Sequence, residues 1–167
     1  QKVKDLAKKL NYRPNPFALS LRKNAPRIIG VVVPDIVTHF FASILNGIEN
    51  MAVKNGYFVI ITTSHESYEH EKRNVENLVN MRLQGIIACL SQETTDYTHF
   101  AELKDINMPL IMFDRVCLTD QFSSVVADGE HSAQMATQHL LDNGCKRVAF
   151  IGGANHLDIV KRRKHGY

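Results

Sequence analysis

The apolar residues follow two different patterns along the chain, and the pattern changes at residue 27. Before that point, Val3, Leu6, Ala7 and Leu10 stand at i, i+3, i+4 and i+7. This spacing predicts one amphipathic helix over residues 2–11. Its apolar face needs other helices to cover it, so we expect the sequence to begin partway through a small helical domain.

After residue 27, continuous apolar runs alternate with helical patterns. Expected strands cover residues 28–33, 57–63, 85–90, 109–113, 124–127 and 147–151. Expected helices cover residues 40–55 (Met51 among the inward side chains), 68–82, 97–104 and 130–143, and the chain stops at Tyr167 in what looks like the start of another helix. Such alternation predicts βαβ units around a parallel sheet with helices on both faces. The part after Asp128 is too short for a second sheet, so we expect truncation at both ends.

A helix start of its own marks the segment between these two parts. Asn15 is a good N-cap, and Pro16 suits the first helical position because its missing N–H is not needed there. Leu21 adds apolar character, and Pro26 ends the helix soon afterwards. A helix of about two turns is marginal alone in water. We expect it to form only against a partner chain or DNA.

The net charge of +3 hides an asymmetry along the chain. Residues 1–27 hold eight Lys or Arg and one acid, a net charge of +7. The other 140 residues hold twelve Lys or Arg and sixteen acids, a net charge of −4. A basic segment on a mildly acidic body indicates a polyanion such as nucleic acid as partner of that segment. The alternative is a solvated helix face, which accounts for most runs of charge.

Several classes of protein lack support in the sequence. No apolar run reaches the roughly 20 residues of a membrane helix, and the N-terminal residues are unlike a signal peptide. The three cysteines have no metal-type spacing, and we expect Cys89 and Cys145 to be small core residues in a protein of the reducing cytoplasm. The sequence has no Gly-x-Ser-x-Gly motif, no phosphate-binding loop and no His-Glu-x-x-His pattern. We therefore expect no catalytic residue, metal or cofactor.

Candidate chemistry gathers where the expected strands end. In open α/β sheets, ligands bind beyond the carboxyl ends of the strands. Here those ends carry Asp35 with Phe40 and Phe41, then Asp114 with Arg115, then Asp128. Aromatic rings beside acids and an arginine suit a polar, ring-shaped small molecule. The alternative is that the phenylalanines pack a helix start and the acids cap helices or bond to loops.

Several motifs in a fixed order resemble one known family. Residues 12–22, Tyr-Arg-Pro-Asn-Pro-Phe-Ala-Leu-Ser-Leu-Arg, resemble the end of the headpiece and the hinge helix of the lactose/galactose repressor (LacI/GalR) family. Ile-Gly-Val-Val-Val-Pro-Asp at 29–35, with Phe40 and Phe41, resembles its first effector-domain strand and pocket loop. Similar segments follow at 113–115, 126–128, 147–153 and 163–167, so the resemblance spans the chain.

The resemblance implies a fold and a division of the chain. The fold is α/β, with a periplasmic-binding-protein-like parallel sheet in one subdomain and an incomplete second subdomain. Residues 1–13 would be the remnant of a helix-turn-helix domain and residues 14–27 the hinge helix and linker. Residues 28–128 would form the N-terminal effector-binding subdomain, and residues 129–167 the start of the C-terminal one.

It also implies a cytoplasmic, homodimeric transcriptional regulator, a repressor that binds operator DNA and a sugar or nucleoside effector. The effector would bind between the two subdomains and change whether the paired hinge helices can form. The implied effector residues are Phe40, Phe41, Asp114, Arg115, Asp128 and Arg163. The implied DNA-binding residues are Tyr12, Asn15, Ala18, Leu21 and Arg22, with Leu21 as an apolar wedge in the minor groove. The recognition helix is absent, and Leu19 stands where many members carry arginine.

Two other classes fit parts of the sequence. A solute-binding protein of similar fold fits the body equally well, but it needs a signal peptide and needs neither the basic segment nor the hinge. An α/β enzyme would need a nucleophile or a cofactor loop, and the sequence offers none.

Overall fold

The computed structural model describes residues 2–10, 12 and 27–167. Helix α1 spans Lys2–Lys9 and confirms the first expected helix, with Leu6 and Leu10 exposed. The helix expected from Asn15 onward lies outside the described residues.

Five parallel strands form the sheet that the sequence predicts. They are β1 (Ile28–Val33), β2 (Phe58–Thr63), β3 (Gly85–Ala88), β4 (Leu110–Phe113) and β5 (Ser123–Val125). Their order is β2-β1-β3-β4-β5, and β1, which lies between β2 and β3, pairs Val31 with Ile61 on one side and with Ile87 on the other. Expected strand ends differ from these bounds by one or two residues, as is usual where a ladder frays.

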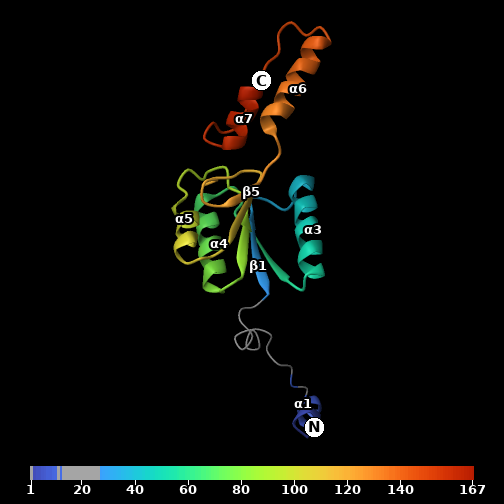
Figure 1. The fold of residues 1–167 in the computed structure, drawn as a ribbon, viewed down its shortest axis with the longest axis vertical. Coiled ribbons are helices and arrows are strands. Elements are labelled where there is room, and N and C mark those ends of the chain that lie inside the picture. The colour runs from blue at the N-terminus through green and yellow to red at the C-terminus, as the bar shows by residue number, and fades with distance from the viewer. Residues whose placement is uncertain (1, 11, 13–26) are drawn as a thin grey trace.

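Helices cover the two faces of the sheet unequally (Figure 1). Helix α3 (His39–Lys54) lies on one face, and α4 (Tyr68–Asn80) and α5 (Thr98–Asp105) lie on the other. Because successive side chains of a strand point to opposite faces, Val32 joins the core beneath α4 and α5, whereas Val31 and Val33 join the core beneath α3. All three valines are fully buried, so β1 is the centre of both cores.

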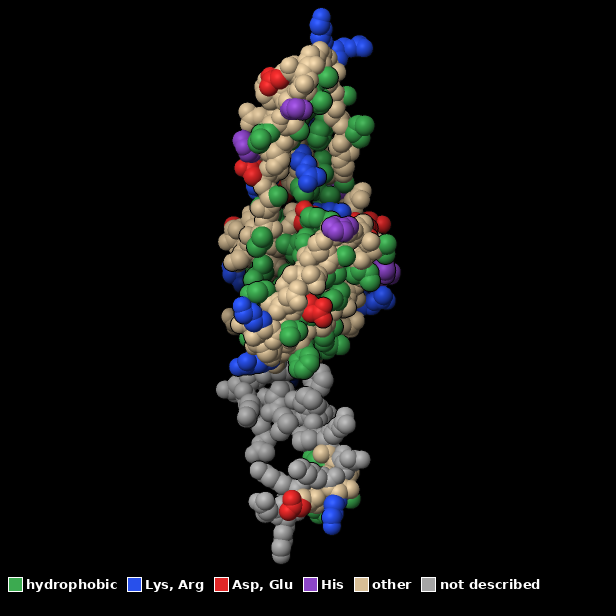
Figure 2. All heavy atoms as spheres, turned by 90° about the vertical axis from the view of Figure 1, so that its right-hand side faces the viewer, with side chains coloured by type: hydrophobic (Ala, Val, Ile, Leu, Met, Phe, Trp, Pro, Cys, Tyr) green, Lys and Arg blue, Asp and Glu red, His purple; other side chains and the backbone are tan. Residues whose placement is uncertain are grey.

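The face of the sheet under α3 is less covered by helices than the face under α4 and α5. Figure 2 shows hydrophobic side chains at the surface on this side of the molecule. Met51 of α3 is 59% exposed although the helical pattern placed it inward. Among the described helices, no second one lies beside α3 on this face of the sheet (Figure 1).

Two further helices lie beyond the carboxyl ends of the strands (Figure 1). Helices α6 (Gly129–Asp142) and α7 (Asp158–Gly166) pack on each other. The expected helix over residues 130–143 and the one near the C-terminal end are therefore confirmed.

The strand expected over residues 147–151 is wrong. These residues have no regular structure, and Ile151 is 96% exposed. A strand needs a neighbour to satisfy its backbone groups, and within the described residues no second strand lies beside this segment. Cys145, expected in a core, is exposed for the same reason, since the strand that would have buried its neighbourhood does not form. Cys89 is buried, as expected.

The described residues include no helix that is both long enough and apolar enough to span a membrane.

Candidate functional site

A groove of about 480 Å³ lies at the carboxyl edge of the sheet, between the start of α3 and the ends of β4 and β5. Its floor is apolar, from Ile44 and Ile48 of α3 and from Ile87 and Phe113 of the sheet. Polar groups enter it from two directions, Asp114 from the end of β4 and Arg163 from α7. An apolar hollow with a few convergent polar groups is the usual form of a small-molecule site.

The two neighbouring phenylalanines have different roles. Phe40 is 51% exposed and lines the groove. Phe41 is 5% exposed and packs edge-on against Phe40 and Phe113, with ring centroids 5.2 and 6.4 Å away. The alternative that these rings pack the start of a helix therefore describes Phe41, whereas Phe40 presents its ring to the groove.

Asp35, at the end of β1, serves its own loop. Its carboxylate accepts hydrogen bonds from the backbone N–H groups of Val37 at 2.9 Å and Thr38 at 3.3 Å. The bond from Val37 is the main reason that the pKa of Asp35 is lowered. This acid fixes the turn into α3.

Asp114 is half-buried and has a positive φ of 57°. Its backbone N–H donates to the carbonyl of Val125, which holds the turn after β4 against β5. Burial raises the pKa of its carboxyl group, and the positive charges of Arg115 and Arg163 oppose that rise. A carboxylate in this position can accept hydrogen bonds from ligand hydroxyl groups.

Arg115 follows Asp114 directly, but its side chain does not line the groove. Its Nη1 donates to Glu66 Oε2 at 2.7 Å and lies 3.4 Å from the carbonyl oxygen of Leu90. Within the described residues its guanidinium thus joins the loops that follow β2 and β3. Arg115 is not among the residues that line the groove, and its Nη1 is engaged by Glu66 and Leu90.

Asp128 is the N-cap of α6, where its Oδ1 accepts from the N–H of His131 at 3.0 Å. It is exposed and lies one residue beyond Ala127, which lines the groove. One oxygen of the Asp128 carboxylate is therefore engaged in capping α6.

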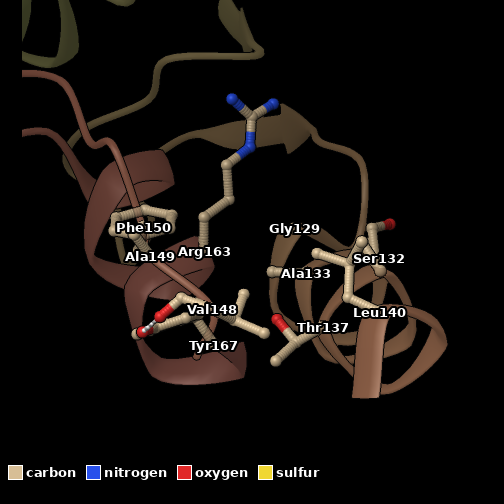
Figure 3. Close-up of a pocket in the computed structure, with 11 residues that line it drawn as sticks. Gly129, Ser132, Ala133, Thr137, Leu140, Val148, Ala149, Phe150, Arg163 and Tyr167 are labelled. Carbon is tan, nitrogen blue, oxygen red and sulfur yellow. Dashed lines mark hydrogen bonds between the residues drawn. The ribbon is translucent and has the colours of Figure 1, made fainter. Parts of the chain in front are cut away.

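Arg163 lines the groove and also a second cavity, of about 320 Å³, between α6 and α7. Figure 3 shows its side chain running out of this second cavity, away from Val148 and Thr137. Tyr167 closes the cavity and donates from its hydroxyl group to the carbonyl of Val148 at 2.8 Å. The cationic end of Arg163 is therefore directed away from the α6–α7 cavity.

A buried polar network, which the sequence reasoning missed, holds the loop after β3. Glu71 of α4 is fully buried, and its carboxylate accepts from Ser91 N at 2.6 Å, Thr94 Oγ1 at 2.7 Å and His99 Nε2 at 3.0 Å. A signal was available, since Glu71 precedes Val75 by four residues and Leu78 by seven, on the face of α4 that packs inward. A charged residue at such a position indicates a partner in the core.

Most of the expected DNA-binding residues lie outside the part of the chain that the structure describes. Tyr12 is described and is 66% exposed. Asn15, Ala18, Leu21 and Arg22 lie outside the described residues. Within the part of the chain that the structure describes, no group of three or more His, Cys, Asp or Glu side chains is arranged to hold a metal ion.

Comparisons with known proteins agree with this architecture. The chain is 32% identical over 169 residues to catabolite control protein A of Priestia megaterium, which covers 98% of this chain and 50% of that protein. It is 29% identical over 160 residues to the ribose operon repressor of Halalkalibacterium halodurans, covering 96% and 46%. The chain thus spans about half the length of these curated relatives.

A solved structure with the same fold carries a sugar. It is the periplasmic binding protein/LacI transcriptional regulator of Alkaliphilus metalliredigens in complex with D-xylulofuranose. It is 28% identical, with a TM-score of 0.73, and the match covers 84% of this chain and 50% of that one.

A family profile matches most of the chain. The profile described as periplasmic binding proteins and sugar binding domain of LacI family matches residues 27–167, which include the whole sheet, the groove and α7. This chain belongs to that family.

Proposed function

We propose that the protein of which this chain is part is a DNA-binding transcriptional repressor whose operator affinity is controlled by a small molecule in the carboxyl-edge groove. The groove carries the proposal, because it brings Phe40, Asp114 and Arg163 together from three separate parts of the chain. Membership of the family and the likeness to a ribose operon repressor support it.

The chemistry of the groove favours a sugar or a nucleoside as effector. The Phe40 ring covers an apolar ring face, the Asp114 carboxylate accepts from hydroxyl groups, and the Arg163 guanidinium donates to ring or hydroxyl oxygens. The related Alkaliphilus protein holds a furanose. Phe41, Arg115 and Asp128 belong to the proposed site as residues of the same edge, which shape the groove and its loops.

The DNA-binding part of the proposal rests on residues 1–27. They carry a net charge of +7, and the likeness to catabolite control protein A covers 98% of the chain and so includes most of them. We assign Tyr12, Asn15, Ala18, Leu21 and Arg22 to DNA contact in a cytoplasmic homodimer, with residues 14–27 as the hinge. Residues 28–128 and 129–167 would belong to two subdomains that close on the effector, and differential binding to two states would supply the control.

A sugar-binding protein that delivers solutes to a transporter is the alternative. The family description includes such proteins, and the groove would serve one equally well. The basic segment and the N-cap sequence pattern at Asn15 favour the regulator, because a solute-binding protein has no use for them.

Operator binding by the full-length protein tests the proposal. Sites selected from a random DNA library would be measured by fluorescence anisotropy, with and without a panel of sugars and nucleosides. We expect affinity to fall steeply with salt through counterion release, and one member of the panel to shift it. Sugar binding without any DNA binding would favour the solute-binding alternative.

Leu21→Ala makes the test residue-specific. Loss of the wedge should weaken operator binding and reduce the bend of the DNA, because the wedge offsets the unstacking of a base step. The control is Met81→Ala, which shortens an exposed side chain at the end of α4 and should leave both unchanged. Equal affinity and equal bend in the Leu21 variant would contradict the wedge role.

A further inference from the structure

The segment before α7 is hydrogen-bonded to the loop after β3. The side chain that makes this bond is His156, which does not line the groove. His156 Nε2 lies 2.8 Å from the carbonyl oxygen of Gln92, a residue 64 positions earlier. A carbonyl oxygen only accepts, so Nε2 carries the proton and donates it. Within the described residues, this is the only hydrogen bond between residues 144–167 and the chain before Asp128.

The loop that receives this bond is itself held firmly. Gln92 donates its N–H to Glu66 Oε2 at 2.6 Å, and the preceding Ser91 donates to Glu71 Oε2 at 2.6 Å. Thr94 is held by the same Glu71 carboxylate. The carboxylates of Glu66 and Glu71 therefore fix the position of the loop that holds the acceptor of the His156 bond.

His156 directly precedes the turn into α7, and Arg163 of α7 lines the groove. Helices α6 and α7 approach so closely that a Cβ on Gly166 would lie 2.0 Å from the carbonyl oxygen of Glu130. The stem of Arg163 lies over Gly129, whose Cβ position is 3.4 Å from Arg163 Cγ. Because the two helices pack this closely, a displacement at the start of α7 would carry Arg163 with it.

We propose that His156 is a positioning residue of the groove, which anchors α7 on the loop after β3 so that Arg163 faces Asp114. As a claim about effector binding, this rests on the function proposed above. As a claim about geometry, it concerns this chain alone.

Asp114 supplies a readout that a merely structural role of His156 would not move. The positive charge of Arg163 lowers the pKa of the Asp114 carboxyl group, against the larger effect of burial. If the anchor is lost and α7 moves away, loss of the Arg163 charge should raise that pKa wherever the burial of Asp114 is unchanged. His156→Gln keeps an N–H donor and should restore it, whereas His156→Ala removes the donor.

The experiment is a carbon-detected NMR titration of Asp114 in residues 1–167. We expect the pKa of Asp114 to rise in His156→Ala and to return towards the starting value in His156→Gln. In an Arg163→Ala background, His156→Ala should change nothing further, because the charge it positions is gone. His139→Ala is the matched control, since His139 is an exposed histidine of α6 whose side chain is hydrogen-bonded to Asn143, the C-cap of the same helix.

Two results would overturn the proposal. One is an unchanged pKa of Asp114 in His156→Ala with the fold intact by circular dichroism. The other is an equal rise with and without Arg163, which would place the action of His156 elsewhere.

Effector affinity of the full-length protein forms a separate arm. Loss of one hydrogen bond should weaken it about three- to tenfold in His156→Ala. The titration needs neither DNA nor effector, so failure of the proposed function and failure of the anchor give different results.

Discussion

His99 Nε2 donates to Glu71 Oε1 across 3.0 Å between α4 and α5, and both side chains are almost fully buried. The same carboxylate fixes Ser91 and Thr94, so one acid on a helix orders the loop that follows β3. That loop in turn accepts the bond from His156. The Glu71 carboxylate therefore joins α4 to α5 in the core and also holds the loop that accepts the His156 bond.

Replacing this acid by its amide tests the network. Glu71→Gln keeps the size of the side chain but loses one acceptor oxygen, so at least one of three buried donors stays unsatisfied. We expect the free energy of unfolding to fall by about 1–3 kcal/mol. The measurement is urea unfolding, with Glu76→Gln on the exposed face of α4 as control and an expected change within about 0.5 kcal/mol. Equal midpoints for the two variants would contradict the role of Glu71.

Asp114 makes stability depend on pH. Burial raises its pKa above the ordinary value, so the folded state holds the proton more tightly than the unfolded state does. Asp114 therefore disfavours folding above its folded pKa, and this effect fades as the pH falls through that pKa towards the unfolded value. Asp114→Asn should raise stability at pH 7, with a gain that shrinks towards pH 4.

Asparagine also tolerates the positive φ of this position, so the backbone should not oppose the exchange. The check is thermal unfolding of both proteins across pH 4–8. A gain that is constant with pH would point to a cause other than ionisation.

The three thiols should differ sharply in reactivity. Burial raises the pKa of Cys89 and of Cys117 to about 12, and the thiolate is the reactive form. Cys145 is exposed. An aromatic disulfide reagent at pH 8 should therefore modify one thiol quickly in the native chain and all three after unfolding. Cys145→Ser should abolish the fast phase, and a fast phase that survives this change would contradict the burial of the other two.

Much of the five-stranded sheet and its helices could be predicted because their determinants are local. The apolar run of residues 28–33 forms β1 between helices on both faces of the sheet, and Gly144 follows the end of α6 with a positive φ of 86°, as its position after the helical pattern suggested. The resemblance also placed Phe40, Asp114 and Arg163, which the structure brings into one groove.

The errors have non-local causes. Residues 147–151 have the composition of a strand, but pairing depends on a neighbour at a distance in the sequence, and none lies beside them in the described residues. The expected role of Arg115 at the effector stays a prediction, while its Nη1 donates to Glu66 Oε2, a partner 49 positions away that sequence spacing does not reveal. The His156 bond joins residues 64 positions apart, which no periodicity reveals.

The contact between α6 and α7 should govern the stability of residues 129–167. Several large apolar side chains of this part are exposed, among them Met135 (60%), Leu141 (47%) and Ile151 (96%), so it has little burial to stabilise it beyond the helix pair. Regions with few buried apolar contacts open at lower free energy than a core does. We expect these residues to exchange amide hydrogens, and to be cleaved by protease, well before the sheet.

Gly166→Ala sharpens that prediction, because the new Cβ would lie 2.0 Å from a backbone oxygen of α6 and cannot be accommodated without moving the helices apart. Exchange should speed up in α6 and α7 while the strands keep their protection. The control is Gly47→Ala in α3, where a Cβ meets nothing within 4 Å. That change should stabilise the chain by about 0.5–1 kcal/mol, because alanine favours a helix over glycine. Faster exchange across the sheet as well would mean that the helix pair and the sheet unfold as one unit, and strong protection of residues 129–167 in the unaltered monomer would refute their lower stability.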